Sequence, residues 1–178
     1  MKKTVKFLIF FTLVIIILFF IAKFIYKDQY IDIIEKECKS YGIDKYEILA
    51  IIKAESNFDS KAVSSKKAIG LMQLTLDTAN WCAKNLNIDE VSEEDLYNPD
   101  LNIKLGIYYY NYLLERYNNS DTALAAYNAG MGKVDNWLND KQYSKDGIKI
   151  DTTPYEETNK YITKINNNYK IYKFLYKE

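Results

Sequence analysis

The stretch Glu55–Gln73 reads ESNFDSKAVSSKKAIGLMQ. Its first residue, Glu55, is the last residue of a strongly apolar segment. A short polar loop follows, and the stretch ends in Gly-Leu-Met-Gln. The apolar positions before it have helical spacing and are Ile48, Leu49, Ile51, Ile52 and Ala54. Asp44, with Glu47 three residues later, predicts a capping box at the start of that segment. We therefore expect a helix that begins after Asp44 and ends on Glu55.

Helical patterns recur on both sides of this segment, with Gly42, Pro99 and Gly130 at expected helix ends or starts. The ranges expected to be helical are 29–41, 76–86 after Thr75, 99–117, 121–129, 133–138 and a last helix opened by Pro154. Residues 139–153 predict a long flexible loop. Six glycines and two prolines in 178 residues argue against a loop-rich or all-β chain. The sequence predicts one all-α domain with room for a short appendage.

The composition excludes several kinds of active site. The chain has no histidine, so Ser-His-Asp and Cys-His mechanisms and His-ligated zinc are excluded, and acid–base chemistry falls to carboxylates, Lys, Tyr or Cys. Cys38 and Cys82 are expected to be buried thiols, with one disulfide on the oxidising side of a membrane as the alternative. Five of the 24 basic residues precede Asp28, so from Asp28 onward 19 basic residues face 24 acidic ones. That balance disfavours nucleic acid as a partner.

The N-terminal segment predicts a membrane-spanning helix. Three lysines in the first six residues precede Phe7–Ala22, which has no charge, and through Tyr26 the segment reaches 20 residues. At ~1.5 Å per residue it spans ~30 Å, the thickness of a bilayer core. A cleaved signal peptide is the alternative, but its small-x-small cleavage site is missing, since only Ala22 is small. We expect 1–27 to be a cytoplasmic tip and transmembrane signal-anchor, and 28–178 to be a single domain outside the cell membrane.

Three motifs stand in the order seen in one enzyme family. They are Glu55-Ser56 with Gly70-Leu71-Met72-Gln73, then Ala126-Tyr127-Asn128-Ala129-Gly130, then Pro154-Tyr155 with Glu157-Thr158-Asn159-Lys160-Tyr161. This set resembles the SLT-like soluble lytic transglycosylases, relatives of goose-type lysozyme that cleave the glycan strands of peptidoglycan. The resemblance covers roughly residues 30–176 and implies a lysozyme-like helical domain.

The resemblance implies a role for each matching position. Glu55 would be the catalytic acid and base. The substrate-binding positions would be Ser64, Met72, Gln73, Tyr127, Asn128, Glu157 and Tyr161. Met72 would be an apolar wall of the cleft, with core packing as the alternative, and Tyr161 would approach Glu55 from the last helix. Ser56 would shape the end of the first helix.

The chemistry implied for Glu55 requires a protonated carboxyl near neutral pH. A free Glu titrates near ~4.3, and apolar surroundings raise that pKa. Most glycosidases use two carboxylates, but the local candidate, Asp59, is expected to cap a loop. In the resembled family one glutamate suffices. Glu55 would protonate the bond between N-acetylmuramic acid and N-acetylglucosamine, the N-acetyl group or cleft dipoles would stabilise the oxocarbenium-like centre, and the same sugar's 6-hydroxyl would close a 1,6-anhydro ring.

Three other functions remain open from the sequence. A lysozyme-type muramidase would use water in place of the 6-hydroxyl, an inactive wall-binding scaffold would keep only the fold, and a plain helical membrane-associated protein would bind no glycan. The transglycosylase is favoured, with peptidoglycan strands as substrate and no metal or cofactor. Because the linker after the anchor is short, we expect action close to the membrane, on new strands or beside a secretion, conjugation or division apparatus.

Overall fold

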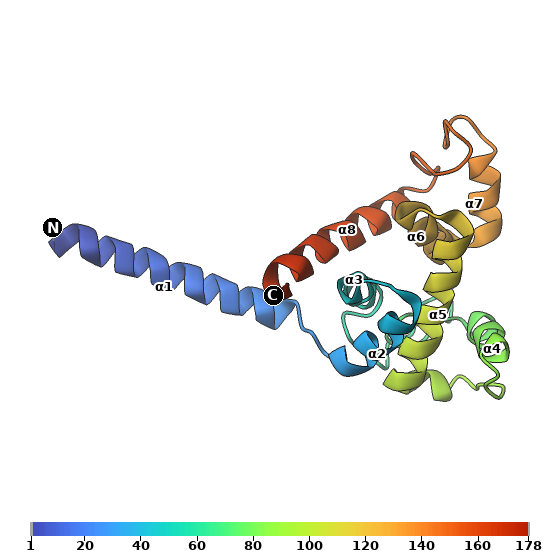
Figure 1. The fold of residues 1–178 in the computed structure, drawn as a ribbon, viewed down its shortest axis with the longest axis horizontal. Helices are drawn as coiled ribbons and strands as arrows, with labels where there is room; N and C mark the ends of the chain where they lie inside the picture. Colours follow the sequence, from blue (N-terminus) through green and yellow to red (C-terminus); the bar gives the residue numbers. More distant parts are fainter. Residues whose placement is uncertain (1, 178) are drawn as a thin grey trace.

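The computed structural model describes residues 2–177, and these form helices joined by turns and loops (Figure 1). The helices are α1 (Lys2–Ile25), α2 (Ile31–Tyr41), α3 (Lys45–Glu55), α4 (Leu76–Asn85), the short 3-10 helix η1 (Asp95–Tyr97), α5 (Pro99–Tyr117), α6 (Ser120–Ala129), α7 (Met131–Leu138) and α8 (Glu156–Tyr176). Extended pairing in this part of the chain is limited to isolated bridges from Ile69 to Val63 and Leu74. The prediction of an all-α chain is confirmed. The outer ends of the predicted segments 1–27 and 28–178, Met1 and Glu178, lie outside the described residues.

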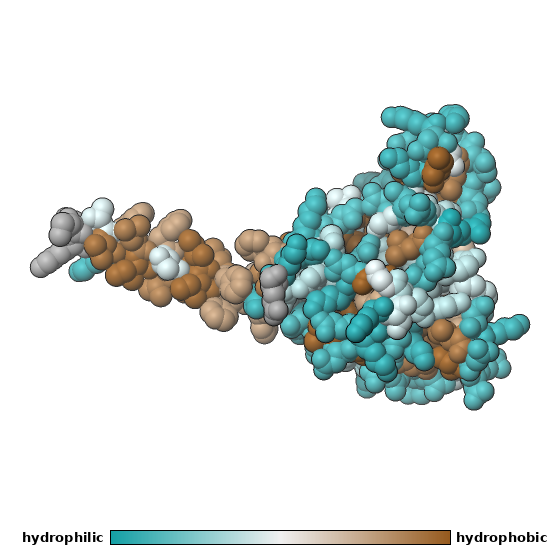
Figure 2. All heavy atoms as spheres, in the orientation of Figure 1, coloured by the Kyte–Doolittle hydropathy of each residue, from teal (hydrophilic) through white to brown (hydrophobic). Residues whose placement is uncertain are grey.

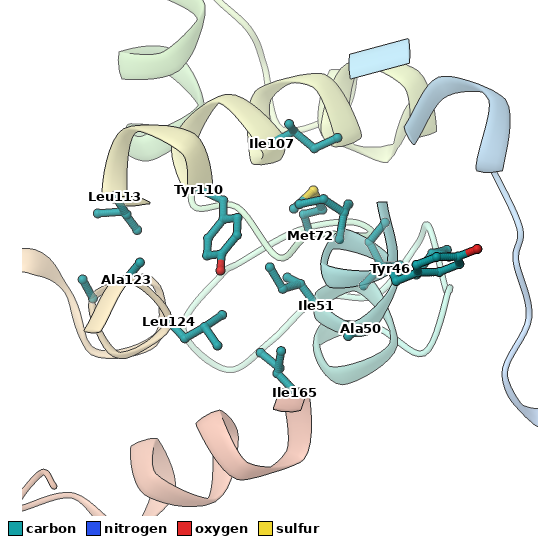
Figure 3. Packing of buried hydrophobic residues seen from close by; sticks show 14 of the residues in the cluster. Tyr46, Ala50, Ile51, Met72, Ile107, Tyr110, Leu113, Ala123, Leu124 and Ile165 are labelled. Atoms are coloured by element: carbon teal, nitrogen blue, oxygen red, sulfur yellow. The ribbon is translucent and has the colours of Figure 1, made fainter. Parts of the chain in front are cut away.

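Helix α3 is the centre of the folded domain. Its middle turns are fully buried, and these residues are Ile48, Leu49, Ala50, Ile51 and Ile52. Helix α8 packs along α3 and α6, while α5 packs against α2, α4 and α6. Figure 3 shows Ile51 of α3 among side chains from α5, α6 and α8. A helix that neighbours cover on all sides is apolar on every face, which explains the continuous apolar run before Glu55.

The ends of several helices are where the sequence predicts them, for the expected reasons. Gly42 ends α2 in the left-handed region, with φ of 69°. The Asp44 carboxylate accepts a hydrogen bond from the Tyr46 N–H at 3.0 Å and caps α3. Pro99 is the first residue of α5, behind Asn98, whose side chain caps the helix.

The capping box predicted from Asp44 and Glu47 is wrong in its second half. The Glu47 carboxylate does not turn back to the helix start. Its Oε1 accepts hydrogen bonds from the hydroxyls of Tyr110 and Ser120, each at 2.6 Å. The side chain therefore ties α3 to α5 and to the start of α6.

The last helix also begins later than predicted, at Glu156 and not at Pro154. The turn before it is closed by Thr153, whose hydroxyl binds the backbone carbonyl of Tyr155 and accepts from the Tyr155 N–H. This turn keeps Pro154 outside the helix.

Both cysteines are buried free thiols, as predicted. Cys38 packs in the core around α3, whereas Cys82 packs in a second core between α4 and α5. Burial raises the pKa of each thiol to about 12. The alternative of a disulfide is not what the structure shows.

Helix α1 leaves the domain as a separate rod (Figure 1). Its residues Thr4–Ile25 form a 22-residue segment with mean hydropathy 3.0, and none of it is buried. Figure 2 shows the hydrophobic surface of this rod next to the largely hydrophilic domain. By length and composition this helix could cross a membrane.

Gly106 of α5 is predicted to resist substitution although it lies inside a helix. A Cβ at this position would lie 2.4 Å from Sδ and 2.7 Å from Cβ of Met72. We expect Gly106→Ala to destabilise the protein by about 1–2 kcal/mol, because overpacking outweighs the helix propensity of Ala. Thermal unfolding in detergent would measure this. Gly132→Ala in α7, where a Cβ meets nothing within 4 Å, is the matched control and should be neutral or stabilising. Equal behaviour of the two variants would contradict the prediction.

Candidate active site

Glu55 is the last residue of α3, and the chain turns sharply after it. The Ser56 N–H still binds the Ile52 carbonyl, and the Ser56 hydroxyl donates to the Leu71 carbonyl at 2.9 Å. Asn57 and Phe58 then adopt left-handed backbone conformations, with φ of 53° and 66°. Phe58 is buried in the core and anchors the turn. The turn leaves the Glu55 side chain at the end of the helix, facing the loop that follows.

A cavity of about 240 Å³ lies in front of Glu55. Its lining combines most of the predicted site residues with several neighbours, and consists of Glu55, Ser64, Ser65, Lys66, Ala68, Gln73, Thr75, Tyr127, Asn128 and Glu157. These residues come from the end of α3, the 56–75 loop, the end of α6 and the start of α8. The structure thus brings all three sequence motifs to one place.

The Glu55 carboxyl has a raised pKa. Burial raises it to about 7, against the opposing effects of a hydrogen bond from Tyr161 and the charge of Lys164. The Tyr161 hydroxyl donates to Glu55 Oε1 at 2.5 Å. The Lys164 ammonium donates to the Ala54 carbonyl at 2.8 Å, which holds it beside Glu55. A carboxyl in this setting is partly protonated at neutral pH.

Tyr127 contributes its ring to the cavity, while its hydroxyl is already engaged. The hydroxyl donates to the Met72 carbonyl at 2.7 Å, and the ring packs against Tyr109 with centroids 5.3 Å apart. Burial and the nearby charge of Glu55 raise the pKa of Tyr127 well above its usual value. Tyr127 therefore stays neutral and links α6 to the backbone of the GLMQ motif.

Met72 does not form the predicted apolar wall of the cleft. Its side chain is 0% exposed and lies between Ile51 and Ile107 in the core (Figure 3). The structure therefore shows the core-packing alternative. What reaches toward the cavity side is the Met72 carbonyl, through its bond to Tyr127.

The amide groups at the cavity are held by hydrogen bonds on one side. Gln73 Nε2 donates to the carbonyls of Ala62 and Gly70, at 3.1 and 2.9 Å. Asn128 Oδ1 accepts from the Thr158 hydroxyl at 2.8 Å. Among the described residues, the other end of each amide, Oε1 of Gln73 and Nδ2 of Asn128, makes no side-chain hydrogen bond.

Ser64 and the two acidic residues Glu157 and Asp59 differ in position and hydrogen bonding. Ser64 Oγ accepts from the Ala68 N–H at 3.0 Å and shapes the loop. The Glu157 side chain is 74% exposed and pairs with Lys66 at 3.8 Å across the cavity mouth. Asp59 accepts from the Lys61 N–H at 2.9 Å, as expected of a loop cap, and does not line the cavity. Of the two carboxyls that line the cavity, Glu55 is only partly exposed, whereas Glu157 is exposed.

Three residues that support the site were missed in the sequence. Thr158 stands inside the third motif, without a predicted role, and Lys164 follows that motif; both act only through the folded arrangement of α8 on α3 and α6. Asn102 of α5 is fully buried and bonds three backbone groups around the GLMQ motif. The only available signal for Asn102 was an amide among apolar residues in a core helix.

Comparisons with known proteins agree with this arrangement. The family model described as Transglycosylase SLT domain matches residues 32–150. The chain is 32% identical over 170 residues to the membrane-bound lytic murein transglycosylase C of Histophilus somni, covering 83% of this chain and 47% of that protein. Among solved structures, it is similar to an inactive mutant of the lytic transglycosylase Slt from Pseudomonas aeruginosa, with a TM-score of 0.73, 32% identity and 84% of this chain covered. It is also similar to the 70 kDa soluble lytic transglycosylase of Escherichia coli, with a TM-score of 0.78, 26% identity and 88% of this chain covered. The chain spans about half the length of the first relative, and 24% and 26% of the two solved chains.

Proposed function

Since the chain belongs to the transglycosylase SLT domain family, we propose that it is a peptidoglycan lytic transglycosylase in which Glu55 is the catalytic acid and base. The observation that carries this proposal is the position of Glu55 in a polar cavity formed by the three motifs, where Tyr161 donates to its carboxyl and burial raises its pKa to about 7. A glycosidic oxygen leaves only when it is protonated, so the acid must hold its proton near neutral pH. Tyr161 orients that carboxyl through its hydrogen bond.

The steps follow from one cavity carboxyl with a raised pKa, Glu55. Protonated Glu55 gives its proton to the oxygen between N-acetylmuramic acid and N-acetylglucosamine as that bond breaks. The substrate's N-acetyl group stabilises the positive charge on the anomeric carbon, because the cavity's other carboxylate, Glu157, is exposed and paired with Lys66. Glu55, now a carboxylate, takes the proton of the 6-hydroxyl as this oxygen attacks the anomeric carbon. The product is a 1,6-anhydro end, and Glu55 regains its proton.

Substrate binding is assigned to the polar groups around Glu55. The free ends of the Gln73 and Asn128 amides, with Ser64 at the loop, offer hydrogen bonds to sugar hydroxyl and acetamido groups. The Tyr127 ring offers an apolar face on which a sugar can stack. Glu157 and Lys66 border the mouth of the cavity.

We further propose that α1 anchors the enzyme in the cell membrane as a single span. Its 22-residue apolar segment is long enough to cross a bilayer, and a relative is named membrane-bound. In this arrangement residues 1–27 are the tip and anchor, and 28–178 are the catalytic domain on the cell-wall side. Carbonate extraction of membranes would test the span. Release of the full chain into the carbonate-soluble fraction would contradict it.

The activity should fall as pH rises through about 7, because the ionised Glu55 carboxylate cannot protonate the leaving oxygen. Tyr161 and Lys164 both lower the pKa of Glu55. Tyr161→Phe and Lys164→Met should therefore raise that pKa and move the decline of kcat/KM to higher pH. Lys160→Met, which removes an exposed lysine paired with Glu156, is the matched control for Lys164. An unchanged or downward shift in both test variants would refute this assignment of Glu55.

A direct assay tests the proposed function. The full chain in detergent micelles is incubated with purified peptidoglycan, and the amount of soluble muropeptides released is measured over time. Release that depends on the folded protein is expected. A helical, folded chain that binds the glycan and releases nothing would point to a wall-binding scaffold instead.

A further inference from the structure

The C-terminal end of α1 is fastened to the catalytic domain by side chains from α3 and α8. The Lys53 ammonium donates to the Ile25 carbonyl at 2.7 Å. The Tyr176 hydroxyl donates to the Tyr26 carbonyl at 2.7 Å, and the Tyr172 hydroxyl to the Lys27 carbonyl at 3.0 Å. Carbonyls at the end of a helix have no partner within it, so these donors complete the hydrogen bonding there.

Ring contacts reinforce the same junction. The Tyr26 and Tyr172 rings meet edge to face with centroids 5.5 Å apart. The Lys23 ammonium lies 4.7 Å from the centre of the Tyr176 ring, and the Lys53 ammonium 5.3 Å from that of Tyr26. The last turns of α8 are thus held at the point where α1 leaves the domain (Figure 1).

One face of α8 at this junction is exposed, basic and aromatic. Lys170 and Phe174 are exposed and four residues apart, which places them on one side of α8, and the exposed Lys177 directly follows the last residue of the helix. Phe174 is 81% exposed, more than any other large apolar side chain in the described part of the chain. In this part of the chain, Lys173 pairs with Asp44, whereas neither Lys170 nor Lys177 is in an ion pair.

The surroundings add further positive charge. Lys27, two residues after the end of α1, is exposed. The pKa of Lys53 is lowered, first by burial and then by the charges of Lys27 and Lys164. Asp28 also lies at this junction, where its charge acts on Tyr172 and Tyr176, but it is outnumbered by the lysines there, which are Lys23, Lys27, Lys53, Lys170 and Lys177.

We propose that this α8 end surface, defined as Lys27, Lys170, Phe174 and Lys177, rests on the anionic headgroups of the bilayer that α1 spans, with the Phe174 ring in the interface. The inference rests on the proposed membrane span of α1. Aromatic side chains favour the interface between lipid and water, and lysines near the surface are attracted to anionic lipid. The surface is continuous with the end of the apolar helix, so it faces the bilayer as soon as α1 is inserted.

This contact would fix the height of the active site above the membrane. Helix α8 begins at the cavity, where Tyr161 bonds Glu55, and ends at the junction with α1. The turns between Tyr161 and Tyr176 are about 22 Å long at ~1.5 Å per residue. Helix α8 is therefore a rigid spacer that holds the cavity within about 20–25 Å of the bilayer surface. Glycan far from the membrane would be out of reach.

A fluorescence experiment tests the contact. The full chain carrying Phe174→Trp is reconstituted into vesicles of phosphatidylglycerol and phosphatidylcholine whose acyl chains are brominated near the headgroup. Ile148→Trp is the matched control, because Ile148 is 68% exposed but lies in the loop between α7 and α8, at the other end of α8 (Figure 1). Trp81 and Trp137 give the same background in both proteins.

The added indole in Phe174→Trp should lose fluorescence to the brominated lipid, and that in Ile148→Trp should not. Adding Lys170→Glu and Lys177→Glu should weaken this quenching in vesicles that contain phosphatidylglycerol. Absence of quenching in Phe174→Trp, in protein that floats with the vesicles, would overturn the inference and leave the proposed span intact. Protein that does not float would overturn both. Cleavage of purified peptidoglycan in detergent is independent of either result.

Discussion

Glu55→Gln should reduce the release of fragments from purified peptidoglycan by about 10³-fold or more, since general acid catalysis contributes on this order. The amide keeps the size of the side chain and can still accept a hydrogen bond from Tyr161, but it has no proton of suitable acidity to give. The binding of glycan should change little, because the other groups of the cavity remain. Initial rates of the full chain in detergent, with separate measurement of binding to insoluble peptidoglycan, would separate the two effects.

Glu157→Gln is the matched control, since it makes the same chemical change at the mouth of the same cavity. Glu157 is exposed and paired with Lys66, so we expect an effect on KM and not a collapse of kcat. If Glu157→Gln removed kcat and Glu55→Gln did not, the assignment of the acid would be wrong.

The folding of Glu55→Gln can be checked by its pH-dependent stability. The folded-state pKa of Glu55 is raised from 4.5 to about 7, so the folded protein binds a proton that the unfolded chain does not bind in this window. The stability contributed by Glu55 is therefore greatest below about 4.5 and is lost as pH rises to about 7. Because Gln cannot ionise, the variant should become more stable than the parent above pH 7, by on the order of 3 kcal/mol.

Asn102→Ala should be the most destabilising single change near the site, by about 3–5 kcal/mol, because it removes the partner of the Met72 N–H and of the Leu96 carbonyl and one of the two donors to the Ile69 carbonyl. Asn102 Oδ1 accepts from the Met72 N–H at 2.8 Å, and Nδ2 donates to the carbonyls of Ile69 and Leu96 at 3.0 and 2.9 Å. These bonds hold the GLMQ motif on α5. Loosening Met72 would also release Tyr127, so activity should fall with stability.

Two further variants make this prediction specific. Asn102→Asp keeps the shape and the acceptor but turns oxygens toward two carbonyls, so its loss of stability should be smaller at low pH, where Asp is protonated. Asn167→Ala on the exposed side of α8 is the control and should stay within about 0.5 kcal/mol. Equal unfolding temperatures for Asn102→Ala and Asn167→Ala would contradict the role of Asn102.

The sequence predicted helices best where local chemistry decides. Gly42 and Pro99 mark helix ends because their backbone preferences act without help from the rest of the chain. Glu47 was misinterpreted because its partners, Tyr110 and Ser120, are distant in sequence and compete with the local cap. The start of α8 was misplaced because the Thr153 turn keeps Pro154 out of the helix.

The site was predictable as a set of positions but not as a geometry. Motif order indicated Glu55, Tyr127 and Tyr161, and the structure brings these side chains together. The GLMQ motif predicted the Met72 side chain in the cleft, but only the Met72 backbone reaches the cavity side. A sequence pattern does not show toward which side of a loop a side chain points. The cavity around Glu55 is lined by four separate segments, and α1 is fastened to α8 by contacts about 150 residues apart.

The mass of the products tests the central claim most directly. Purified peptidoglycan is digested by the full chain in detergent and by Glu55→Gln, and the muropeptides are analysed by mass spectrometry. Products one water lighter than those of hydrolysis, formed by the parent and absent with the variant, are the result expected of a lytic transglycosylase that uses Glu55. Products with ordinary reducing ends would contradict this and identify a muramidase of the same fold.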